Sequence, residues 1–435
     1  MRSVAVDVLD NAEPATAAQE AAAPAAAKQR KSVVVYGMNY APEIAGVGRY
    51  TGEIAEYLAA EGMHVTVVTT PPHYPGWKVR PGYRNRYSTA KENGVRIVRA
   101  PLVLKERMGG LWRLLAPLSF AITSAPVVFW QIVRRRPDTV FCVEPTLFAA
   151  PVAQFAARLV GAQTLLHVQD LEVDAAFAVG HLGEKGWLKK LGYGFERLTL
   201  RRFDKVITIS NRMAEKLAEK GIRRERLSVI RNWVDLSHIY PMEEVSSYRA
   251  ELGFTEEDFV VLYSGNIGAK QGLNVLLDAA ESLKDDKSIH FVIAGEGPVK
   301  AELLARYGAL GNVRFLPFQP HARLNEFLNM PDLHVLPQDR GAADLVLPSK
   351  LGGMLASGRP ILVTADDQTE LAEFLDGYAL VTPPGEAAPL AAAVARRAET
   401  RNAASPAVAP ALTGLLSRTR RLEELVAHFS IIEKR

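Results

Sequence analysis

Short apolar segments alternate with longer amphipathic segments along most of this chain. The apolar runs are rich in Val, Ile and Leu and are bounded by Gly, Pro or polar residues, which is typical of buried strands. The segments between them place apolar residues at helical spacing. This alternation predicts an α/β protein whose mostly parallel sheets carry helices on both faces. The predicted strands comprise residues 32–36, 65–69, 139–143, 164–168, 206–210, 227–230, 259–264, 290–294, 313–316, 333–336 and 361–364.

The alternation is interrupted once, near residues 232–247, and then begins again. We therefore predict two facing, doubly wound, Rossmann-like domains in tandem. Ligands of such sheets bind beyond the carboxyl ends of the strands, so two facing domains predict a cleft for two substrates. The expected divisions are a disordered Ala- and Pro-rich tail (1–31), a first domain (32–235), a hinge (236–248), a second domain (249–415) and a C-terminal helix that could return to the first domain (416–435).

Composition narrows the classes of function. The formal net charge of +4 over 435 residues is small, and basic residues occur in local clusters rather than as an extended face, which argues against nucleic acid as a partner. The single cysteine, Cys142, lies in an apolar run, and it excludes an internal disulfide framework and a Cys-rich metal site. This cysteine content favours a reducing, cytoplasmic compartment. Residues 1–31 also contain no apolar core of a secretory signal.

Residues 114–133 form an uncharged segment that three arginines, residues 134–136, follow directly. Its length and basic flank resemble a membrane span. Pro117 and Pro126 weaken that interpretation, and the α/β pattern resumes immediately afterwards. Three interpretations stay open: a span, a buried core helix, and an interfacial helix pair that places the arginines at anionic lipid headgroups.

Residues 339–360, DRGAADLVLPSKLGGMLASGRP, follow a predicted strand and predict an anion site. Pro348 marks the start of a helix with Ser349 and Lys350 in its first turn, and Gly358 marks its end. The free N–H groups and positive dipole end of such a helix, together with the lysine, suit a diphosphate. An ordinary strand–helix–strand unit with a solvated lysine would show the same pattern.

Two glycine-containing turns also follow predicted strands in the second half. Residues 265–268, GNIG, would let backbone N–H groups approach a diphosphate without Cβ atoms in the way, and Lys270 could balance its charge. Residues 295–297, GEG, occupy the corresponding place after the next strand. A plain turn between a strand and a helix would look the same.

In the first half, the loop after the first predicted strand contains Gly46 and Gly48 but lacks the third glycine of a dinucleotide-binding motif. We expect these glycines to let the backbone approach a ligand. The loop at residues 71–82 carries Tyr74, Trp77 and Lys78, which could line a sugar or lipid-phosphate groove. Alternatively, the two aromatic residues could pin the loop to the domain.

Polar residues also end the predicted strand at residues 164–168. The acids Asp170, Glu172 and Asp174 follow His167 and could orient the hydroxyl groups of a substrate. Two alternatives remain, which are a metal site that includes Glu172 and Asp174, and a structural His167 that bonds the backbone.

Taken in order, these segments resemble the nucleotide-sugar glycosyltransferases of the GT-B architecture, family 4. The resemblance runs from residue 32 to beyond residue 360 and is carried by order and spacing together. The matching strings are YGMNYAPEIAGVGRYTGEIAEYLAAEGMHVTVVTTPPHYPGW, YSGNIGAKQGL, GEGPVKAELL, GNVRFLP and RGAADLVLPSK. They look most like the enzymes of colanic-acid-type exopolysaccharide biosynthesis, a branch associated with fucosyl transfer.

The resemblance implies a retaining, metal-independent enzyme that needs no cofactor, whose first domain binds the acceptor and whose second domain binds the nucleotide-sugar donor. It would move a sugar such as fucose from a GDP- or UDP-sugar to a lipid-linked oligosaccharide. It would be cytoplasmic and peripheral on the inner face of the cell membrane, with an anionic membrane surface as a partner. A catalytically inactive nucleotide-sugar-binding accessory protein and a nucleotide-sugar epimerase are the alternatives.

The residues and the resemblance together assign roles. Catalytic roles fall to His167, Lys270 and Asp344, donor binding to Gly265, Asn266, Gly268, Gly295, Glu296, Gly297, Ser349 and Lys350, and acceptor binding to Gly46, Gly48, Arg49, Tyr74, Trp77 and Asp170. The family often carries two glutamates eight positions apart, and Leu345 and Gly353 stand there instead. Asp344 could replace the first of them. Asn266 stands where an arginine is frequent, so the lysines would compensate more of the donor's charge.

Overall fold

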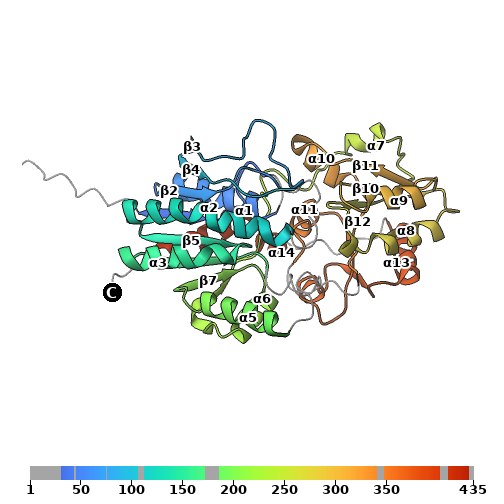
Figure 1. Ribbon diagram of the computed structural model, residues 1–435. Coiled ribbons are helices and arrows are strands. Elements are labelled where there is room, and N and C mark those ends of the chain that lie inside the picture. Colours follow the sequence, from blue (N-terminus) through green and yellow to red (C-terminus); the bar gives the residue numbers. More distant parts are fainter. Residues whose placement is uncertain are drawn as a thin grey trace, which may run out of the picture. The chain divides into compact units, whose positions relative to one another are not determined.

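Two β-sheets organise the part of the chain that the computed structural model describes (Figure 1). That part comprises residues 31–43, 46–74, 76–105, 112–171, 186–339, 347–401 and 410–430. The strand orders are β3-β4-β2-β1-β5-β6-β7-β8 and β11-β10-β9-β12-β13-β14. Within the described chain, every pairing of these strands is parallel except that of β3 with β4. The prediction of two doubly wound domains with mostly parallel sheets is confirmed.

The strands are short and most are flanked by helices. They are β1 (Ser32–Tyr36), β2 (His64–Thr69), β3 (Ser88–Glu92), β4 (Val95–Arg99), β5 (Thr139–Glu144), β6 (Gln163–Val168), β7 (Lys205–Thr208), β8 (Leu227–Val229), β9 (Phe259–Ser264), β10 (Ile289–Ala294), β11 (Val313–Leu316), β12 (Leu333–Leu336), β13 (Ile361–Thr364) and β14 (Leu380–Thr382). The helices are α1 (Val47–Ala60), α2 (Trp112–Arg135), α3 (Ala150–Val160), α5 (Gly186–Leu200), α6 (Asn211–Glu219), α7 (Ser247–Glu251), α8 (Leu273–Ser282), α9 (Lys300–Tyr307), α10 (Leu324–Asn329), α11 (Leu351–Ala356), α12 (Glu370–Phe374), α13 (Ala387–Glu399), α14 (Pro410–Gly414) and α15 (Arg418–Ser430).

Each face of the first sheet has its own buried core. Successive side chains of a strand point to opposite faces, so Val34 and Tyr36 enter one core while Val33 and Val35 enter the other. Helices α2 and α3 contribute to the first of these cores, and α1 contributes to the second. Burial on both faces explains why the strands read as continuous apolar runs.

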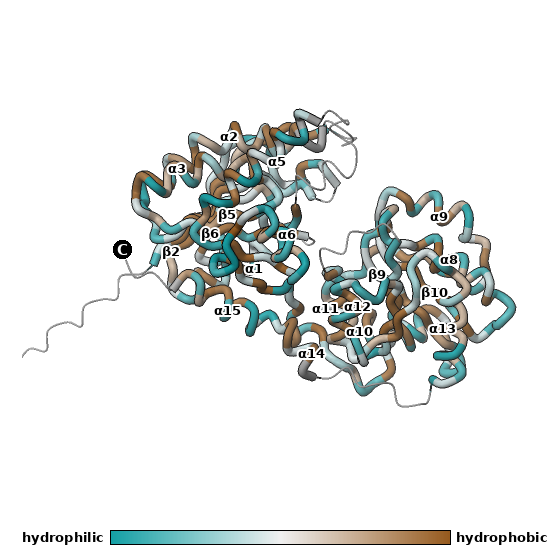
Figure 2. The backbone as a smooth tube through the Cα atoms, turned by 90° about the horizontal axis from the view of Figure 1, so that it is seen from below, coloured by the Kyte–Doolittle hydropathy of each residue, from teal (hydrophilic) through white to brown (hydrophobic). Residues whose placement is uncertain are grey.

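The C-terminal helix α15 packs on the first domain beside α1 (Figure 2). Leu422, Leu425 and Phe429 lie in the same core as Val33 and Val35, and the Phe429 ring lies 5.2 Å from that of Phe141. The chain therefore returns to the first domain after completing the second.

Helix α2 is one continuous helix of 24 residues, which corrects the expected helix pair. Pro117 and Pro126 lie inside it. Phe120, Val128 and Ile132 on one face are buried in the core of the first domain. These contacts hold the helix together although each proline removes a backbone hydrogen bond. By length and composition α2 could cross a membrane, and 33% of its apolar window is buried.

The antiparallel pair β3–β4 was missing from the predicted strands. All five residues of β3, STAKE, are exposed at the edge of the sheet. Such a strand carries no apolar run and no alternation, so the sequence offered no signal for it.

Candidate active site

The lysine at position 350 lies against the glycine turn that follows β9. A Cβ atom added to Gly265 would lie 2.8 Å from Cε and 2.9 Å from Nζ of Lys350. Gly265 also has a φ of 148°, which disfavours any other residue. The structure thus brings together two predicted donor-binding residues that are 85 positions apart in the sequence.

The turn that contains Gly295 and Gly297 packs closely against the turn at residues 265–268. An added Cβ would lie 1.8 Å from the Gly265 carbonyl oxygen at Gly295 and 2.1 Å from the Ile267 carbonyl oxygen at Gly297. The Ile267 N–H also donates to the Glu296 carbonyl oxygen at 2.9 Å. These two glycines are therefore explained by the close packing of one backbone on another.

The surroundings of Lys350 lower the pKa of its amine. Its Nζ lies 4.0 Å from the centroid of the Tyr263 ring and donates to the Tyr263 hydroxyl. Burial lowers the pKa of Lys350 to about 7 and raises the pKa of Tyr263. Among the described residues, no carboxylate pairs with this amine. An arriving diphosphate would supply the missing negative charge and favour the protonated amine.

The helix that follows starts later than expected. Helix α11 begins at Leu351, so Ser349 and Lys350 precede it rather than forming its first turn, and it spans only six residues. The positive charge of Lys350 is therefore a stronger basis for anion binding here than a helix dipole. Asp344 and Leu345 lie outside the described residues.

Three other predicted residues of these turns are exposed, namely Asn266, Lys270 and Glu296, whereas Gly268 is buried. Lys270 lies exposed in the 3-10 turn Ala269–Gln271, close to the first glycine turn in sequence. Asn266 is exposed as well, and an added Cβ at Gly268 would lie 2.6 Å from Oε1 of Gln271. The Glu296 carboxylate pairs with Lys300 at 2.7 Å.

In the first domain, the predicted acceptor residues gather at the start of α1. Gly46 is the N-cap of this helix, and an added Cβ there would lie 3.2 Å from the Tyr74 ring. At Gly48, an added Cβ would lie 2.2 Å from the Glu43 carboxylate. Glu43 is buried and accepts the N–H groups of His73 and Tyr74, both at 3.0 Å. This carboxylate ties the proline-rich loop to the start of α1.

Trp77 is half-buried in the loop, whereas His167 lies inside the first domain. The Trp77 ring lies 5.6 Å from the His73 ring. The backbone of Trp77 has a φ of 52°. His167 is buried, with its ring 5.8 Å from that of Phe141, and burial lowers its pKa to about 4. His167 therefore lies within the core at the end of β6 and lines neither cavity described below.

Asp170 is exposed just beyond the end of β6, where its carboxylate accepts the N–H of Leu171 at 2.9 Å. The two further acids of the metal interpretation, Glu172 and Asp174, lie outside the described residues. Within the described ranges, no three His, Cys, Asp or Glu side chains gather as a metal ion would need.

A cavity of about 550 Å³ brings residues of both domains together. Arg49 of α1 lines it from the first domain, and Ser349, Lys350 and Gly353 line it from the second. An added Cβ at Gly353 would meet only Leu328, at 3.0 Å. The position where the family carries a glutamate therefore faces this cavity. Its ionisable lining residues are Arg49, Glu53, Asp235, His238, His321, Lys350 and Arg418.

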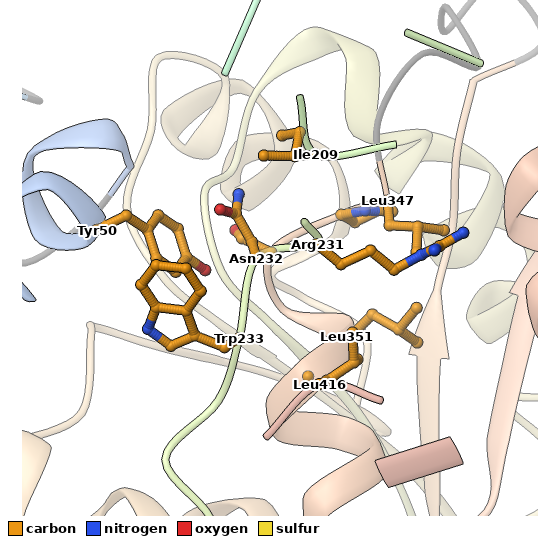
Figure 3. Close-up of a pocket in the computed structure, with 11 residues that line it drawn as sticks. Tyr50, Ile209, Arg231, Asn232, Trp233, Leu347, Leu351 and Leu416 are labelled. Atoms are coloured by element: carbon orange, nitrogen blue, oxygen red, sulfur yellow. The ribbon is translucent and has the colours of Figure 1, made fainter. Parts of the chain in front are cut away.

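A smaller cavity of about 20 Å³ lies beside residues 231–246, the linker that follows β8 of the first domain and precedes α7 of the second (Figure 3). The rings of Tyr50 and Trp233 meet edge to face at 5.2 Å on one side, and Leu351 and other apolar residues close the other. Arg231 and Asn232 of the linker lie between them. The Arg231 Nε and the Asn232 Oδ1 are buried and have no hydrogen-bond partner among the described residues.

Sequence reasoning missed three residues that organise the site. In the sequence, Tyr263 is indistinguishable from the other apolar residues of its strand, but in the structure its hydroxyl accepts a hydrogen bond from the Lys350 amine. Glu43 lies in a loop and contacts residues 30 positions away. Arg231 begins the linker, and its partner Glu370 is 139 positions away. No local spacing pattern could have revealed the latter two contacts.

Comparison with known families assigns both halves of the chain. Residues 45–233 match the glycosyl transferase 4-like domain, and residues 244–405 match the glycosyl transferases group 1. WcaI of Escherichia coli strain K12, described as a candidate colanic acid biosynthesis glycosyl transferase, is 40% identical over 355 residues, which are 80% of this chain and 86% of WcaI.

Solved structures share the fold. The sucrose-phosphate synthase of Thermosynechococcus elongatus aligns with a TM-score of 0.70 and 16% identity, covering 92% of this chain and 98% of the synthase. HepE of Anabaena, in complex with UDP and glucose, aligns with a TM-score of 0.64 and 16% identity, covering 93% of this chain and 100% of HepE. Together with the family matches, these findings show that the chain is a glycosyltransferase and belongs to family 4 of the GT-B glycosyltransferases.

Proposed function

We propose that the protein transfers a sugar from a nucleoside-diphosphate sugar to a lipid-linked oligosaccharide, with retention of configuration, in exopolysaccharide biosynthesis of the colanic-acid type. The observation that carries the proposal is the Lys350 amine against the Gly265 turn, in a cavity that Arg49 of the first domain also lines. This arrangement offers a cation and backbone N–H groups to a diphosphate, and it faces the other domain.

The reaction breaks the bond between the anomeric carbon and the diphosphate oxygen. A bond from the acceptor hydroxyl oxygen to that carbon forms, and the hydroxyl proton passes to the departing phosphate. Negative charge therefore develops on the leaving group. Lys350, with the exposed Lys270 and the N–H groups of residues 265–268, would stabilise it. In this proposal, the diphosphate charge is balanced without a metal ion or cofactor.

The donor is proposed to be a GDP- or UDP-sugar, with fucose as the first sugar to test. HepE was crystallised with UDP and glucose, which supports a nucleotide sugar in this fold. The 40% identity to WcaI supports an exopolysaccharide product. Gly353 leaves room beside the donor site where a glutamate is usual, so sugar recognition is expected to differ from that of relatives with the glutamate.

A panel of donors tests the proposal. The purified protein is incubated with GDP-fucose, UDP-glucose and UDP-galactose, each with a lipid extract of membranes that contain the growing oligosaccharide. We expect release of nucleoside diphosphate in step with glycosylation of the lipid for one donor. Tight donor binding without turnover on any donor would instead support an accessory protein, and an epimerised donor would support an epimerase.

We also propose that the protein works on the cytoplasmic face of the cell membrane, attached through α2 and α3. Large apolar side chains are exposed along these two helices, namely Leu118, Ile122, Trp130, Phe155 and Leu159. The apolar stripe of α2 ends in arginines, and Arg134 lies over the Trp130 ring at 5.9 Å.

A nearby cavity of about 270 Å³ is lined by basic residues and by no acidic residue. The pKa of Arg135 in this lining is lowered by burial and by the positive charges of Arg96 and Arg134. Apolar and cationic groups side by side suit an anionic bilayer surface.

Replacing Ile122 by Asn and Trp130 by Gln together should weaken binding to vesicles of anionic phospholipid by about tenfold or more, because two large apolar side chains no longer enter the lipid. Sedimentation with vesicles measures this. Leu304→Asn, on an exposed face of α9 in the second domain, is the matched control and should leave binding as it is. Equal binding by the double variant and the control would refute attachment through α2.

A further inference from the structure

Glu370 of the second domain lies at the N-terminus of α6 in the first domain. Its side chain is buried, with a relative exposure of 4%. Its Oε1 accepts the Asn211 N–H at 3.1 Å, and its Oε2 accepts the Arg212 N–H at 2.9 Å. The first N–H groups of a helix have no partner within the helix, and the helix dipole favours a negative charge there. The carboxylate thus binds one domain to the other at a point suited to an anion.

Arg231 of the linker holds the same carboxylate from another side. Its Nη2 donates to the Glu370 Oε1 at 2.8 Å, and its guanidinium lies 5.1 Å from the centroid of the Phe374 ring, also on α12. The neighbouring Asn232 donates from its amide to the Gln169 Oε1 at 3.0 Å. Gln169 directly follows β6, at the edge of the sheet where the acceptor is expected.

A second contact in the same area is exposed to solvent. Arg212 donates to the Glu373 carboxylate at 3.0 Å and to the Gln368 carbonyl at 2.7 Å, but the side chains of Arg212 and Glu373 are 34% and 60% exposed. Exposed pairs of this kind contribute little. The buried Glu370 is therefore expected to supply most of the polar attraction between α6 and α12.

We propose that Glu370 is a positioning residue for sugar transfer, a latch that holds the two domains in the closed arrangement where Lys350 and Arg49 line one cavity. When the domains separate, the carboxylate becomes solvated, and α6 and Arg231 both lose their anion. The latch therefore stabilises the closed arrangement selectively, since a contact shifts an equilibrium only by its difference between the two states. The role in transfer rests on the proposed function, whereas closure itself can be measured without turnover.

The test compares Glu370→Gln with Glu373→Gln in the full chain. The amide keeps the shape of the side chain but removes its charge and leaves Arg231 without its anion. We expect the radius of gyration in small-angle X-ray scattering to increase for Glu370→Gln, and kcat to fall by about tenfold to a hundredfold. The dissociation constant of the nucleoside diphosphate should change less than threefold, because the proposed diphosphate site lies in the second domain. Glu373→Gln, one turn farther along α12, should change each quantity much less.

Arg231→Gln provides a second route to the same result. It leaves α12 unaltered and should open the domains to a similar extent, and the double variant should be no worse than the poorer single variant. An unchanged radius of gyration in both Glu370→Gln and Arg231→Gln would overturn the latch. Opening without loss of kcat would overturn the positioning role and leave the proposed sugar transfer intact. Absence of transfer in the unaltered protein would instead count against the proposed function alone.

Discussion

Replacing Lys350 by methionine is expected to lower kcat/KM for sugar transfer by about 10²- to 10³-fold. Loss of one fixed charge-stabilising group from a leaving-group site typically has an effect of this size. The amine lies against the Gly265 turn, and no carboxylate among the described residues neutralises its charge, so its removal takes away a cation that is directed at the proposed diphosphate site. Steady-state kinetics with the best donor of the panel measures the change.

The pH dependence gives this prediction a second readout. Free Lys350 loses its proton as the pH rises through about 7. Because the protonated amine is the form proposed to bind the diphosphate, KM for the donor should increase above pH 7, and Lys350→Met should remove that increase. The effect on folding has the opposite sign. In the folded protein, the pKa of Lys350 lies below its ordinary value of 10.5. Between pH 7 and 10.5 the unfolded chain therefore binds more protons at this lysine than the folded protein does. The contribution of Lys350 to the free energy of unfolding accordingly becomes more favourable as the pH rises through that window.

Two further lysine variants are the comparisons for Lys350→Met. Lys270→Met should cost no more than about tenfold in kcat/KM, because an exposed charge is screened by water. Lys284→Met, an exposed lysine that follows α8, should behave like the unaltered protein. Equal losses for Lys350→Met and Lys284→Met would exclude Lys350 from the diphosphate site.

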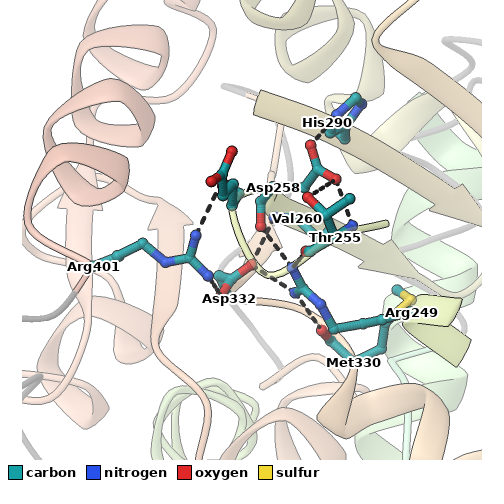
Figure 4. Close-up of polar contacts among 9 residues, drawn as sticks. Arg249, Thr255, Asp258, Val260, His290, Met330, Asp332 and Arg401 are labelled. Carbon is teal, nitrogen blue, oxygen red and sulfur yellow. Dashed lines mark hydrogen bonds and ion pairs between the residues drawn. The ribbon is translucent and has the colours of Figure 1, made fainter. Parts of the chain in front are cut away.

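Arg249→Met is expected to lower the free energy of unfolding of the second domain by about 3–5 kcal/mol. The buried guanidinium pairs with Asp332 at 2.9 Å and donates to the carbonyl oxygens of Thr255 and Asp258 at 2.7 and 2.6 Å (Figure 4). Removing the guanidinium takes away one of the two arginines that pair with Asp332 and leaves the two carbonyl groups without this donor. Asp332 retains Arg401, at 3.2 Å, which keeps the loss within this range.

Urea unfolding measures this loss, with the early transition assigned to the second domain through fluorescence probes. Arg306→Met, which removes an exposed pair with Asp278, is the control and should cost less than about 1 kcal/mol. A loss for Arg249→Met no larger than that of the control would contradict the importance of this network.

The strands that run through the centres of the sheets could be predicted because they are buried on both faces. Val33, Val34 and Val35 are apolar without exception, and a run of this kind has few alternatives. β3 could not be predicted, since an exposed edge strand is specified by its pairing with β4 rather than by its own residues. The single helix α2 was missed for a related reason, because packing of Phe120 and Val128 outweighs two prolines that locally favour a break.

The part of the candidate site that could be predicted is the part made of glycine turns and a lysine, because these are typical of an anion-binding site. Gly265 and Lys350 were identified in this way, and the structure places them in contact. The residues that set the properties of that lysine could not be identified, because Tyr263 acts through a contact between distant segments. His167 shows the converse, since its position at a strand end did not reveal that it is buried.

The return of the chain to the first domain constrains how this protein could diversify. The polypeptide passes between the domains once through the linker at Arg231 and again before α15, where Val234 pairs with Ser417. A single genetic crossover within the linker would therefore join a first domain to a foreign α15, whose Leu425 and Phe429 must fit the core beside α1. Exchange of the second domain between relatives by recombination should accordingly require two crossovers, one on each side of that domain, with α15 inherited together with the residues that it covers.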